Sequence, residues 1–396
     1  MTERLYYQDS SLIEFDARIV RRVAAPDGRP GVILDRTAFY PTSGGQPFDT
    51  GTLGTARVLD VGEQDDGELL HVLDTPIAGD AVHGAVDWAR RLDHMQQHTG
   101  QHVLSAAFER VLGARTESFH LGAEASTIDL GREVSGDEAA AAEDEANRVV
   151  WGDRPVTIRF ADASDAARLP LRKESGREGT LRLIEVADFD LSACGGTHVA
   201  RTGMIGLIAI AGIERFKAGS RAEFVCGGRA LRSHRRLRDI VAATGKLLSV
   251  GPHEVAGSVE RVQAEAKELR RQIKESQTRL AGHEAAALAE GALVGPSYRA
   301  AIAVLEGWDA QGLKQIASSI VARPGHIAIL LSAPAPSSLV VARSADTTFD
   351  AAAALKQMLG RFGGKGGGRP ELAQGGGLTG SPDDVAAFAR TLAGLS

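Results

Sequence analysis

Cysteine is scarce in this sequence, with only Cys194 and Cys226 among 396 residues. Two cysteines could form one disulfide, but Cys194 lies close to His198, which favours reduced thiols and a cytoplasmic location. The first residues are polar and contain no apolar core of a signal peptide. We therefore expect a protein that keeps its thiols free for other chemistry.

Long apolar runs are also absent. The longest, "MIGLIAIAGI" from Met204, is too short to span a bilayer, so it predicts a buried strand and no membrane association. A hydrophobic content of 43% with 24% charged residues is typical of a globular protein. The sequence therefore argues against the membrane and disordered classes.

An overall basic charge is missing too, because the formal net charge is −6. This excludes a surface that is basic throughout, but local clusters can still bind nucleic acid. One such cluster, "RALRSHRRLRD", begins at Arg229. At helical spacing it is equally compatible with a solvated helix face, and the sequence leaves the two interpretations open.

The length and the changing periodicity predict an α+β multidomain protein with four parts. Residues 1–90 alternate short apolar runs with turns and predict a small β-barrel. Residues 91–228 predict an α+β domain and residues 291–396 a small α/β domain. The elements expected in these two domains are helices at 91–112, 135–150, 309–322 and 348–359 and strands at 156–160, 181–186, 205–212 and 222–226.

Residues 229–290 predict a helical, coiled-coil-like linker. Apolar or small residues recur every four and three positions, which is a heptad seam; they are Val255, Val259, Val262, Ala266, Leu269, Ile273, Ser276 and Leu280. This seam is compatible with an intramolecular hairpin on residues 231–248 and with a coiled coil in a homodimer. The sequence leaves both arrangements open.

Two short stretches, "HTGQH" and "CGGTH", each hold a pair of metal ligands. His98 and His102 project from one face of the predicted helix, one turn apart. Cys194 and His198 bracket a tight glycine-containing turn. Three nitrogens and one sulfur suit one zinc ion per chain. Peptidase motifs need a glutamate base inside or beside the pair, but here the intervening residues are Thr99, Gly100 and Gln101, which argues against a peptidase. A purely structural zinc remains open.

These motifs carry a family resemblance. "QQHTGQHVLSAAFE", "CGGTHV" and "AFYPTSGGQPFDTG" resemble the editing domain of alanyl-tRNA synthetase and, more closely, the free-standing AlaX editing proteins. "ESFHLG" and "GGKGGGRPELAQGGG" extend the match, and the latter resembles the signature of the synthetase's C-terminal tRNA-binding domain. The resemblance implies a β-barrel module with an SGGQ motif (1–90), a zinc editing domain (91–228), a helical linker (229–290) and a C-terminal tRNA-binding domain (291–396).

The resemblance also implies a function, namely hydrolysis in trans of the ester that joins serine to mischarged tRNA(Ala). Glycine on the same tRNA is a second candidate substrate. Because the sequence has no DHH triplet and no room before the barrel for an aminoacylation domain, we expect deacylation without aminoacylation. A zinc-bound water and a substrate oriented by zinc are both compatible with the ligands. A hydrolase for another aminoacyl-tRNA, and a tRNA-binding protein with a structural zinc and no catalysis, are the alternatives.

Candidate substrate contacts lie in the same motifs, where a plain hairpin turn is the alternative for "TSGGQ". They are Thr42, Ser43, Gly44, Gly45, Gln46, Gly195, Gly196 and Thr197. Gln46 is a candidate catalytic residue and the favoured contact for the serine hydroxyl, because its amide can donate and accept a hydrogen bond.

Two cationic stretches are candidate tRNA contacts. Arg215, Lys217 and Arg221 are expected at a hairpin tip, for which an ordinary charged turn is the alternative. Arg361, Lys365 and Arg369 flank a glycine run that predicts either an anion-binding nest or a flexible loop.

Overall fold

The computed structural model describes residues 2–166, 168–173, 179–333 and 336–395. The chain divides into two compact units, Met1–Ala243 and Thr244–Ser396. The expected division into four parts remains a prediction. None of the described helices is long and apolar enough to cross a membrane.

The N-terminal part of unit 1 is a closed six-stranded barrel, as the sequence predicts. Alternating side chains of the first barrel strand, Glu14–Ala24, point inward, and Phe15, Ala17 and Ile19 are buried. The strands follow the order β2 (Glu14–Ala24), β3 (Pro30–Leu34), β7 (Leu69–Leu73), β6 (Ala56–Glu63), β5 (Gly51–Leu53) and β8 (Ala81–Val86). A short parallel pair, β1 (Glu3–Arg4) with β4 (Arg36–Thr37), and a 3₁₀ turn at Leu5–Tyr7 lie beside it in the chain.

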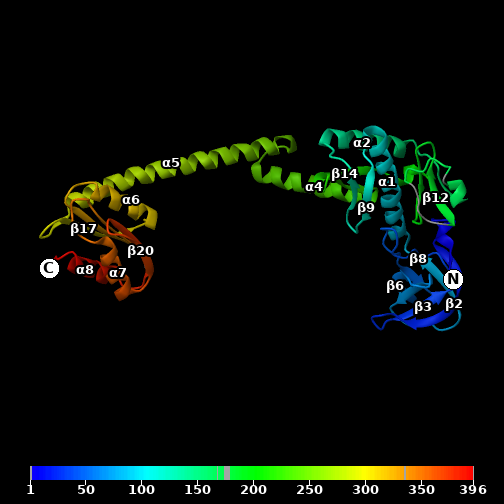
Figure 1. Cartoon of the computed structure of the whole chain (residues 1–396), viewed down its shortest axis with the longest axis horizontal. Helices are drawn as coiled ribbons and strands as arrows, with labels where there is room; N and C mark the ends of the chain where they lie inside the picture. The colour runs from blue at the N-terminus through cyan, green and yellow to red at the C-terminus, as the bar shows by residue number, and fades with distance from the viewer. Residues whose placement is uncertain (1, 167, 174–178, 334–335, 396) are drawn as a thin grey trace. The chain divides into compact units, whose positions relative to one another are not determined.

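Helix α1 (Trp88–Leu112) leaves the barrel and is the central element of unit 1. The side chain of Asp87 caps its first turn, and Gly113 ends it in the left-handed conformation. Figure 1 shows α1 running from the barrel to the sheet that contains β9 and β14. Nearly every side chain from His94 to Phe108 is buried, so residues on this helix can build an internal site.

Two sheets and a second helix complete unit 1. The four-stranded sheet has the order β14 (Ile208–Phe216), β15 (Gly219–Cys226), β10 (Ser126–Leu130) and β9 (Thr116–Leu121). The three-stranded sheet is β11 (Val156–Asp162), β12 (Thr180–Val186) and β13 (Asp190–Ala193), followed by a 3₁₀ turn at Thr202–Ile205; the short helix α3 (Ala163–Ala166) follows β11. Helix α2 (Gly136–Trp151) begins with the expected capping box between Ser135 and Glu138.

The prediction of a buried strand from Met204 is wrong in its start and its burial. The strand begins at Ile208, whereas Met204 and Leu207 are exposed in and after a 3₁₀ turn. Strand β14 lies at the edge of its sheet and pairs only with β15, with a register shift before Gly212. An edge strand of this kind leaves much of its surface exposed despite an apolar sequence.

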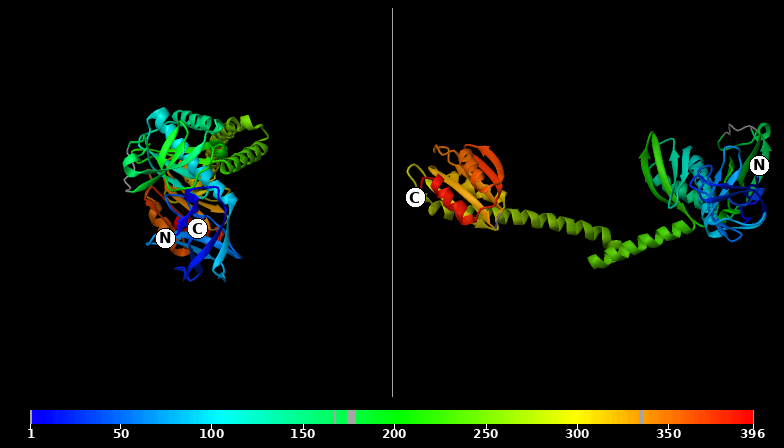
Figure 2. Two further views of the ribbon diagram at one scale, coloured as in Figure 1. Left: turned by 90° about the vertical axis from the view of Figure 1, so that its right-hand side faces the viewer. Right: turned by 90° about the horizontal axis from the view of Figure 1, so that it is seen from below.

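Unit 2 contains a six-stranded mixed sheet covered on both faces by helices. Its order is β16 (Leu293–Val294), β17 (Arg299–Glu306), β18 (His326–Ala333), β19 (Ser337–Arg343), β21 (Leu372–Leu378) and β20 (Lys365–Arg369). Helices α7 (Ala351–Phe362) and α8 (Pro382–Leu392) cover one face, and α6 (Ala310–Val321) with the end of α5 (Val255–Glu290) covers the other. The right-hand view of Figure 2 shows α8 lying across this sheet.

The glycine run forms a β-hairpin, so both earlier interpretations of it, a nest and a flexible loop, are wrong for residues 366–368. These glycines pair with β21 in extended conformation. A Cβ atom on Gly366 or Gly368 would lie 2.4 or 2.3 Å from the backbone of β21, whereas Gly367 faces open space. Glycine is therefore required by the close approach of two backbones.

Helices α4 (Gly228–Leu248) and α5 (Val255–Glu290) occupy the predicted linker. Along the heptad seam, Leu269, Ile273 and Leu280 are each more than half exposed, at 51%, 56% and 56%. These three side chains of α5 are therefore exposed within unit 2, and the choice between a hairpin and a homodimer stays a prediction.

Candidate metal centre

The four predicted metal ligands lie together in unit 1. His98 and His102 come from α1, while Cys194 and His198 belong to the loop after β13. One ligand atom from each residue lies within 4.8 Å of all the others. The Cys194 sulfur is 3.3 Å from Nε2 of both His98 and His198. The three histidines are buried and Cys194 is partly buried, and three nitrogens and one sulfur that converge on one point fit a tetrahedral zinc ion.

Each histidine of the centre is held by a hydrogen bond at Nδ1, which leaves Nε2 to face the ligand cluster. Such outer contacts fix the tautomer and the ring orientation in metal sites. The pairs are His98 with Gln46 Oε1 at 2.8 Å, His102 with Asp190 Oδ2 at 3.2 Å and His198 with Thr99 Oγ1 at 3.2 Å.

The electrostatics of the cluster favour the ionised thiol. Burial raises the pKa of the Cys194 thiol, but His98 and His198 reverse this effect and hold the pKa well below its ordinary value. Burial lowers the pKa of His102, but the hydrogen bonds that its ring donates to Asp190 and Cys194 raise this pKa to about 9. A thiolate is the form of cysteine that binds metals.

Arg182 on β12 positions the loop that carries Cys194. Its Nη1 donates to the carbonyl oxygens of Cys194 and Gly196, both at 2.8 Å, and its Nε donates to the carbonyl of Tyr7. A Cβ atom at Gly196 would lie 2.1 Å from Cε1 of His98. Glycine at this position therefore allows the loop to approach the histidine closely.

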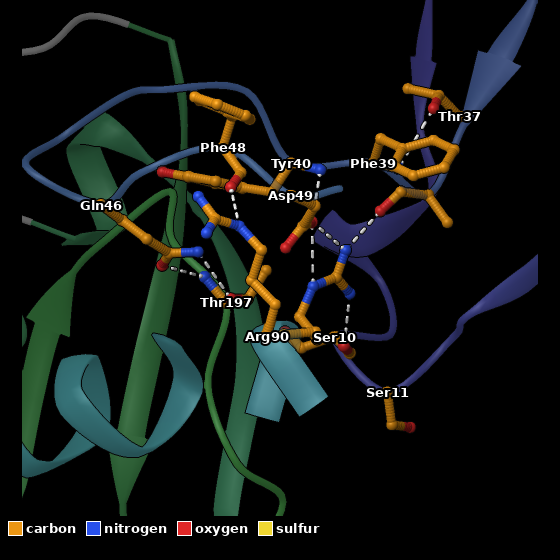
Figure 3. Close-up of polar contacts among 12 residues, drawn as sticks. Ser10, Ser11, Thr37, Phe39, Tyr40, Gln46, Phe48, Asp49, Arg90 and Thr197 are labelled. Carbon is orange, nitrogen blue, oxygen red and sulfur yellow. Dashed lines mark hydrogen bonds and ion pairs between the residues drawn. The ribbon is translucent and has the colours of Figure 1, made fainter. Parts of the chain in front are cut away.

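The SGGQ segment is a tight turn beside this loop. Ser43 and Gln46 exchange both backbone hydrogen bonds, and the two glycines between them have φ values of +54° and +81°. The hairpin-turn interpretation is therefore correct, and it coincides with a contact to the metal centre. Gln46 Nε2 donates to Thr197 Oγ1 at 2.8 Å, and the Thr197 N–H donates to Gln46 Oε1 at 3.1 Å (Figure 3).

A buried ion pair anchors the same segment to α1. Arg91 and Asp49 are both fully buried, and Arg91 Nε donates to Asp49 Oδ2 at 3.0 Å. Asp49 also accepts from the Tyr40 N–H at 2.7 Å, a contact shown in Figure 3. Because an unpaired buried charge is costly, this pair keeps both ends of the segment against the helix.

A cavity adjoins the metal centre. It is bounded by the N-terminal turn, the SGGQ segment and the cysteine loop, and its lining consists of Arg4, Tyr6, Tyr7, Tyr40, Pro41, Ser43, Gly44, His98, Cys194, Gly195 and Gly196. Of the predicted substrate contacts, Thr42, Gly45, Gln46 and Thr197 lie outside this lining. Gln46 and Thr197 have no exposed surface. The Gln46 side chain therefore contacts His98 and Thr197 and does not line the cavity, and its role as a substrate contact stays a prediction.

Three tyrosines that line the cavity, Tyr6, Tyr7 and Tyr40, were not predicted from the sequence. Tyr6 packs edge-on against Tyr7 and Tyr40, with ring centroids 5.0 and 5.2 Å apart. The Tyr6 hydroxyl is buried and has no hydrogen-bond partner among the described residues. Tyr40 lies close before the SGGQ motif in the chain, and that proximity is the signal that could have identified it.

The predicted tRNA contacts of unit 1 lie at and near the tip of the β14–β15 hairpin. Arg221 is bound by Asp129 through two hydrogen bonds, at 2.6 and 3.0 Å. Arg215 pairs with Glu133 at 2.9 Å, and Lys217 occupies the turn with φ +53°. Two of the three cations are thus already neutralised, and their contact with tRNA stays a prediction.

The predicted tRNA contacts of unit 2 belong to α7 and β20. Arg361, near the end of α7, lies over the ring of Phe388 at 4.5 Å from its centroid. Lys365 and Arg369 begin and end the exposed edge strand β20. Their contact with tRNA also stays a prediction.

Three family models match parts of the chain. The model described as threonyl and alanyl tRNA synthetase second additional domain matches residues 181–221, which include the cysteine loop. The class II (A) tRNA synthetase model matches residues 3–90, and the DHHA1 domain model matches residues 297–394.

Known proteins are similar along nearly the whole chain. The alanyl-tRNA editing protein AlaX-L of Pyrococcus horikoshii is 33% identical over 393 residues, which are 95% of this chain and 94% of the relative. The alanine–tRNA ligase of Pyrococcus abyssi is 32% identical over 391 residues, so this chain spans only 42% of that enzyme. The solved C-Ala domain of Aquifex aeolicus alanyl-tRNA synthetase covers 26% of this chain at 20% identity and a TM-score of 0.24, too low to support an argument.

Proposed function

Because this chain belongs to the family of alanyl-tRNA editing proteins that includes AlaX-L, we propose that it removes serine from mischarged Ser-tRNA(Ala) in trans. The observation that carries the proposal is the convergence of His98, His102, Cys194 and His198 beside a small cavity. Glycine on the same tRNA is a second proposed substrate. The proposed activity is ester hydrolysis without ATP and without aminoacylation.

The residues of the chain fit the binding of one zinc ion, which would polarise the ester, a water molecule or the substrate's amino group when bound. The three histidines and the thiolate of Cys194 would hold the ion. Gln46, Asp190 and Thr99 keep the imidazole rings in place. Gly195 and Gly196 form one wall of the cavity and leave room for the ester beside the ligands.

Discrimination between serine and alanine requires a polar group in the cavity. A site that pairs the serine hydroxyl rejects the substrate lacking it, because its own polar group is then left unpaired. Ser43 is the predicted contact that lines the cavity and carries a side-chain hydroxyl. We assign it this role in place of Gln46, whose amide is committed to His98 and Thr197.

The proposed partner is tRNA(Ala), held in part by unit 2 through Arg361, Lys365 and Arg369, with a cytoplasmic location. We also propose a homodimer, through the helical linker or the C-terminal domain. The exposed heptad seam of α5 supports the linker, since three or more heptads can form a two-stranded coiled coil.

The test is release of serine from Ser-tRNA(Ala) by the full chain, with and without a chelator and after zinc is restored. We expect rapid release that the chelator abolishes, slow release from Ala-tRNA(Ala), and none in Cys194→Ala. Cys226→Ala is the matched control, because Cys226 is buried and free but lies outside the cluster.

Two outcomes would favour the alternatives. A folded, zinc-containing protein that binds tRNA but releases no amino acid would be a tRNA-binding protein with a structural zinc. Faster release from another aminoacyl-tRNA than from Ser-tRNA(Ala) would identify a hydrolase of different specificity.

A further inference from the structure

A second cavity in unit 1, of about 310 Å³, lies outside the metal-centre cavity. It is formed by the first turns of α1, the start of α4, the segment after the SGGQ turn and the turn between β9 and β10. Its charged and titratable lining residues are Arg90, Asp93, His94, Arg229 and Arg232. We call this cavity the arginine pocket.

The arginine pocket has an excess of positive charge, since three guanidinium groups face one carboxylate. Asp93 is committed to Arg229, whose Nε and Nη2 lie 3.0 and 2.6 Å from Oδ2. Arg232 is only 3.7 Å from Asp93 and is 67% exposed at its side chain. Arg90 donates from Nε to the carbonyl of Phe48 at 2.9 Å, which leaves its terminal nitrogens available.

A buried polar atom in the pocket lacks a partner. His94 is only 5% exposed, and its Nδ1 has no hydrogen-bond partner among the described residues. Burial, together with Arg90, lowers the pKa of His94 to about 4, so the ring is neutral at pH 7 and can donate one hydrogen bond. Leaving such an atom unpaired is costly, so a bound group that reaches it from the pocket would gain a hydrogen bond.

The pocket is next to the metal centre along the chain and in space. His94 precedes His98 by four residues on α1, so the two rings lie about one helical turn, or about 5.4 Å, apart along the helix axis. The SGGQ segment connects both places, because Gln46 contacts Thr197 while Phe48 contacts Arg90 (Figure 3).

We propose that the arginine pocket binds a phosphodiester group near the 3′ end of the tRNA whose aminoacyl ester lies at the metal centre. This proposal rests on the proposed function and extends it to the RNA part of the substrate. Arginine matches the geometry of phosphate oxygens through paired donors, and it stays charged at every physiological pH. A neighbouring phosphate of the same strand is the anion that the bound ester brings into reach.

The experiment compares two substrates with wild type, Arg232→Ala and Arg90→Ala. One substrate is Ser-tRNA(Ala), and the other is the 3′-serine ester of adenosine, which has the ester but no phosphate. We expect kcat/KM for Ser-tRNA(Ala) to fall at least ~10-fold in each variant, with less than ~2-fold change for the adenosine ester. The slope of log kcat/KM against log salt should also fall by about 0.7 for each lost phosphate contact.

Arg57→Ala is the matched control, since it removes the same charge from an exposed position on β6 outside the pocket. Arg90→Ala also loses the hydrogen bond to Phe48 and could fail to fold for that reason. In that case Arg232→Ala alone tests the proposal. An equal loss on both substrates, or no loss on Ser-tRNA(Ala), would overturn the proposal.

Failure of the proposed function has a different signature, namely that wild type hydrolyses neither substrate. Binding of uncharged tRNA(Ala) then decides the question for the pocket. Weaker binding by Arg232→Ala than by Arg57→Ala supports it, and equal binding overturns it.

Discussion

Gln46 and His98, 52 residues apart in the chain, are joined by a hydrogen bond of 2.8 Å between Oε1 and Nδ1. The same oxygen accepts the N–H of Thr197, and the amide nitrogen donates to the Thr197 hydroxyl. One buried side chain from the barrel segment thus fixes a helix residue and the cysteine loop together. Loss of the Gln46 side chain should therefore weaken metal binding and leave the preference for serine over alanine unchanged.

We expect Gln46→Ala to weaken zinc binding and deacylation by about 10–100-fold, the usual effect of removing an outer contact to a metal-binding histidine. Release of serine and release of alanine should fall together, so their ratio stays constant. Competition with a zinc-binding dye and deacylation of both charged tRNAs measure this. Gln96→Ala, on the same helix but outside the cluster, is the control. If the ratio of serine release to alanine release narrows only in Gln46→Ala, Gln46 contacts the serine hydroxyl after all.

The two glycines of the cysteine loop provide a matched pair of substitutions. A Cβ atom at Gly196 would meet His98 Cε1 at 2.1 Å and Gln46 Oε1 at 3.0 Å, whereas one at Gly195 would meet only Tyr7, at 3.5 Å. We expect Gly196→Ala to lose most bound zinc and activity and Gly195→Ala to keep its zinc. Elemental analysis of both purified variants checks this, and equal zinc content would contradict the close approach of the loop.

The cluster of candidate metal ligands could be predicted from the sequence because both pairs are set by local geometry. Residues four apart on a helix share one face, and two ligands around a short glycine-containing turn lie close together. Asp190 and Arg182 could not be predicted, since their contacts with the site depend on the pairing of β12 with β13. The cavity tyrosines likewise depend on how the N-terminal turn folds against the barrel.

The errors in the fold prediction have related causes. Apolar content at residues 204–213 indicated burial, but burial depends on how many neighbours a strand has, and β14 has one partner strand. Glycine has low strand propensity, so the sequence of β20 indicated a loop. Its hairpin instead depends on β21, against which side chains at Gly366 and Gly368 would clash.

The buried His71 makes the stability of the barrel depend on pH. Its Nε2 lies 2.9 Å from the Thr37 hydroxyl, and burial lowers its pKa from 6.5 to about 4. The unfolded chain therefore binds the extra proton between these values, so folding stability falls as pH decreases from 6.5 towards 4 and is unaffected above 6.5. At pH 5 the loss should be roughly 2 kcal/mol.

Hydrogen–deuterium exchange of barrel peptides measures this loss when wild type and His71→Gln are compared at each pH. The variant keeps a side chain that can bond to Thr37 but does not titrate. Its barrel should lose less protection than wild type between pH 6.5 and 5. Parallel losses in the two proteins would assign the acid sensitivity to other groups.

The glycine hairpin of unit 2 gives a test of tRNA binding in which charge does not change. We expect Gly368→Ala to disrupt the end of the hairpin, because its Cβ would lie 2.3 Å from the Cα of Ala373, and to weaken binding of tRNA(Ala). Gly367→Ala, with no atom within 4 Å of its Cβ, should bind as wild type does. If the two variants bind tRNA(Ala) with equal affinity although only one of them has an opened hairpin, this hairpin is not part of the tRNA-binding surface.

Serine specificity is expected to depend on Ser43, whose backbone is held rigidly beside the ligands. It exchanges two hydrogen bonds with Gln46, and its carbonyl accepts the Tyr40 hydroxyl at 3.0 Å. In Ser43→Ala the substrate hydroxyl loses its partner, at a cost of roughly 1–3 kcal/mol, or about one to two decades in kcat/KM for Ser-tRNA(Ala). Release of alanine should not change, so the preference for serine narrows.

Thr42→Val is the control for this change, because Thr42 is the exposed neighbour outside the cavity lining. Deacylation of serine- and alanine-charged tRNA by the three proteins, at equal zinc content, makes the comparison. An unchanged ratio in Ser43→Ala would assign the contact with the serine hydroxyl to another group of the cavity wall. One candidate is Tyr6, whose hydroxyl has no partner among the described residues. Equal release of serine and alanine by wild type would refute the editing function itself, because an editing enzyme must spare the correctly charged tRNA.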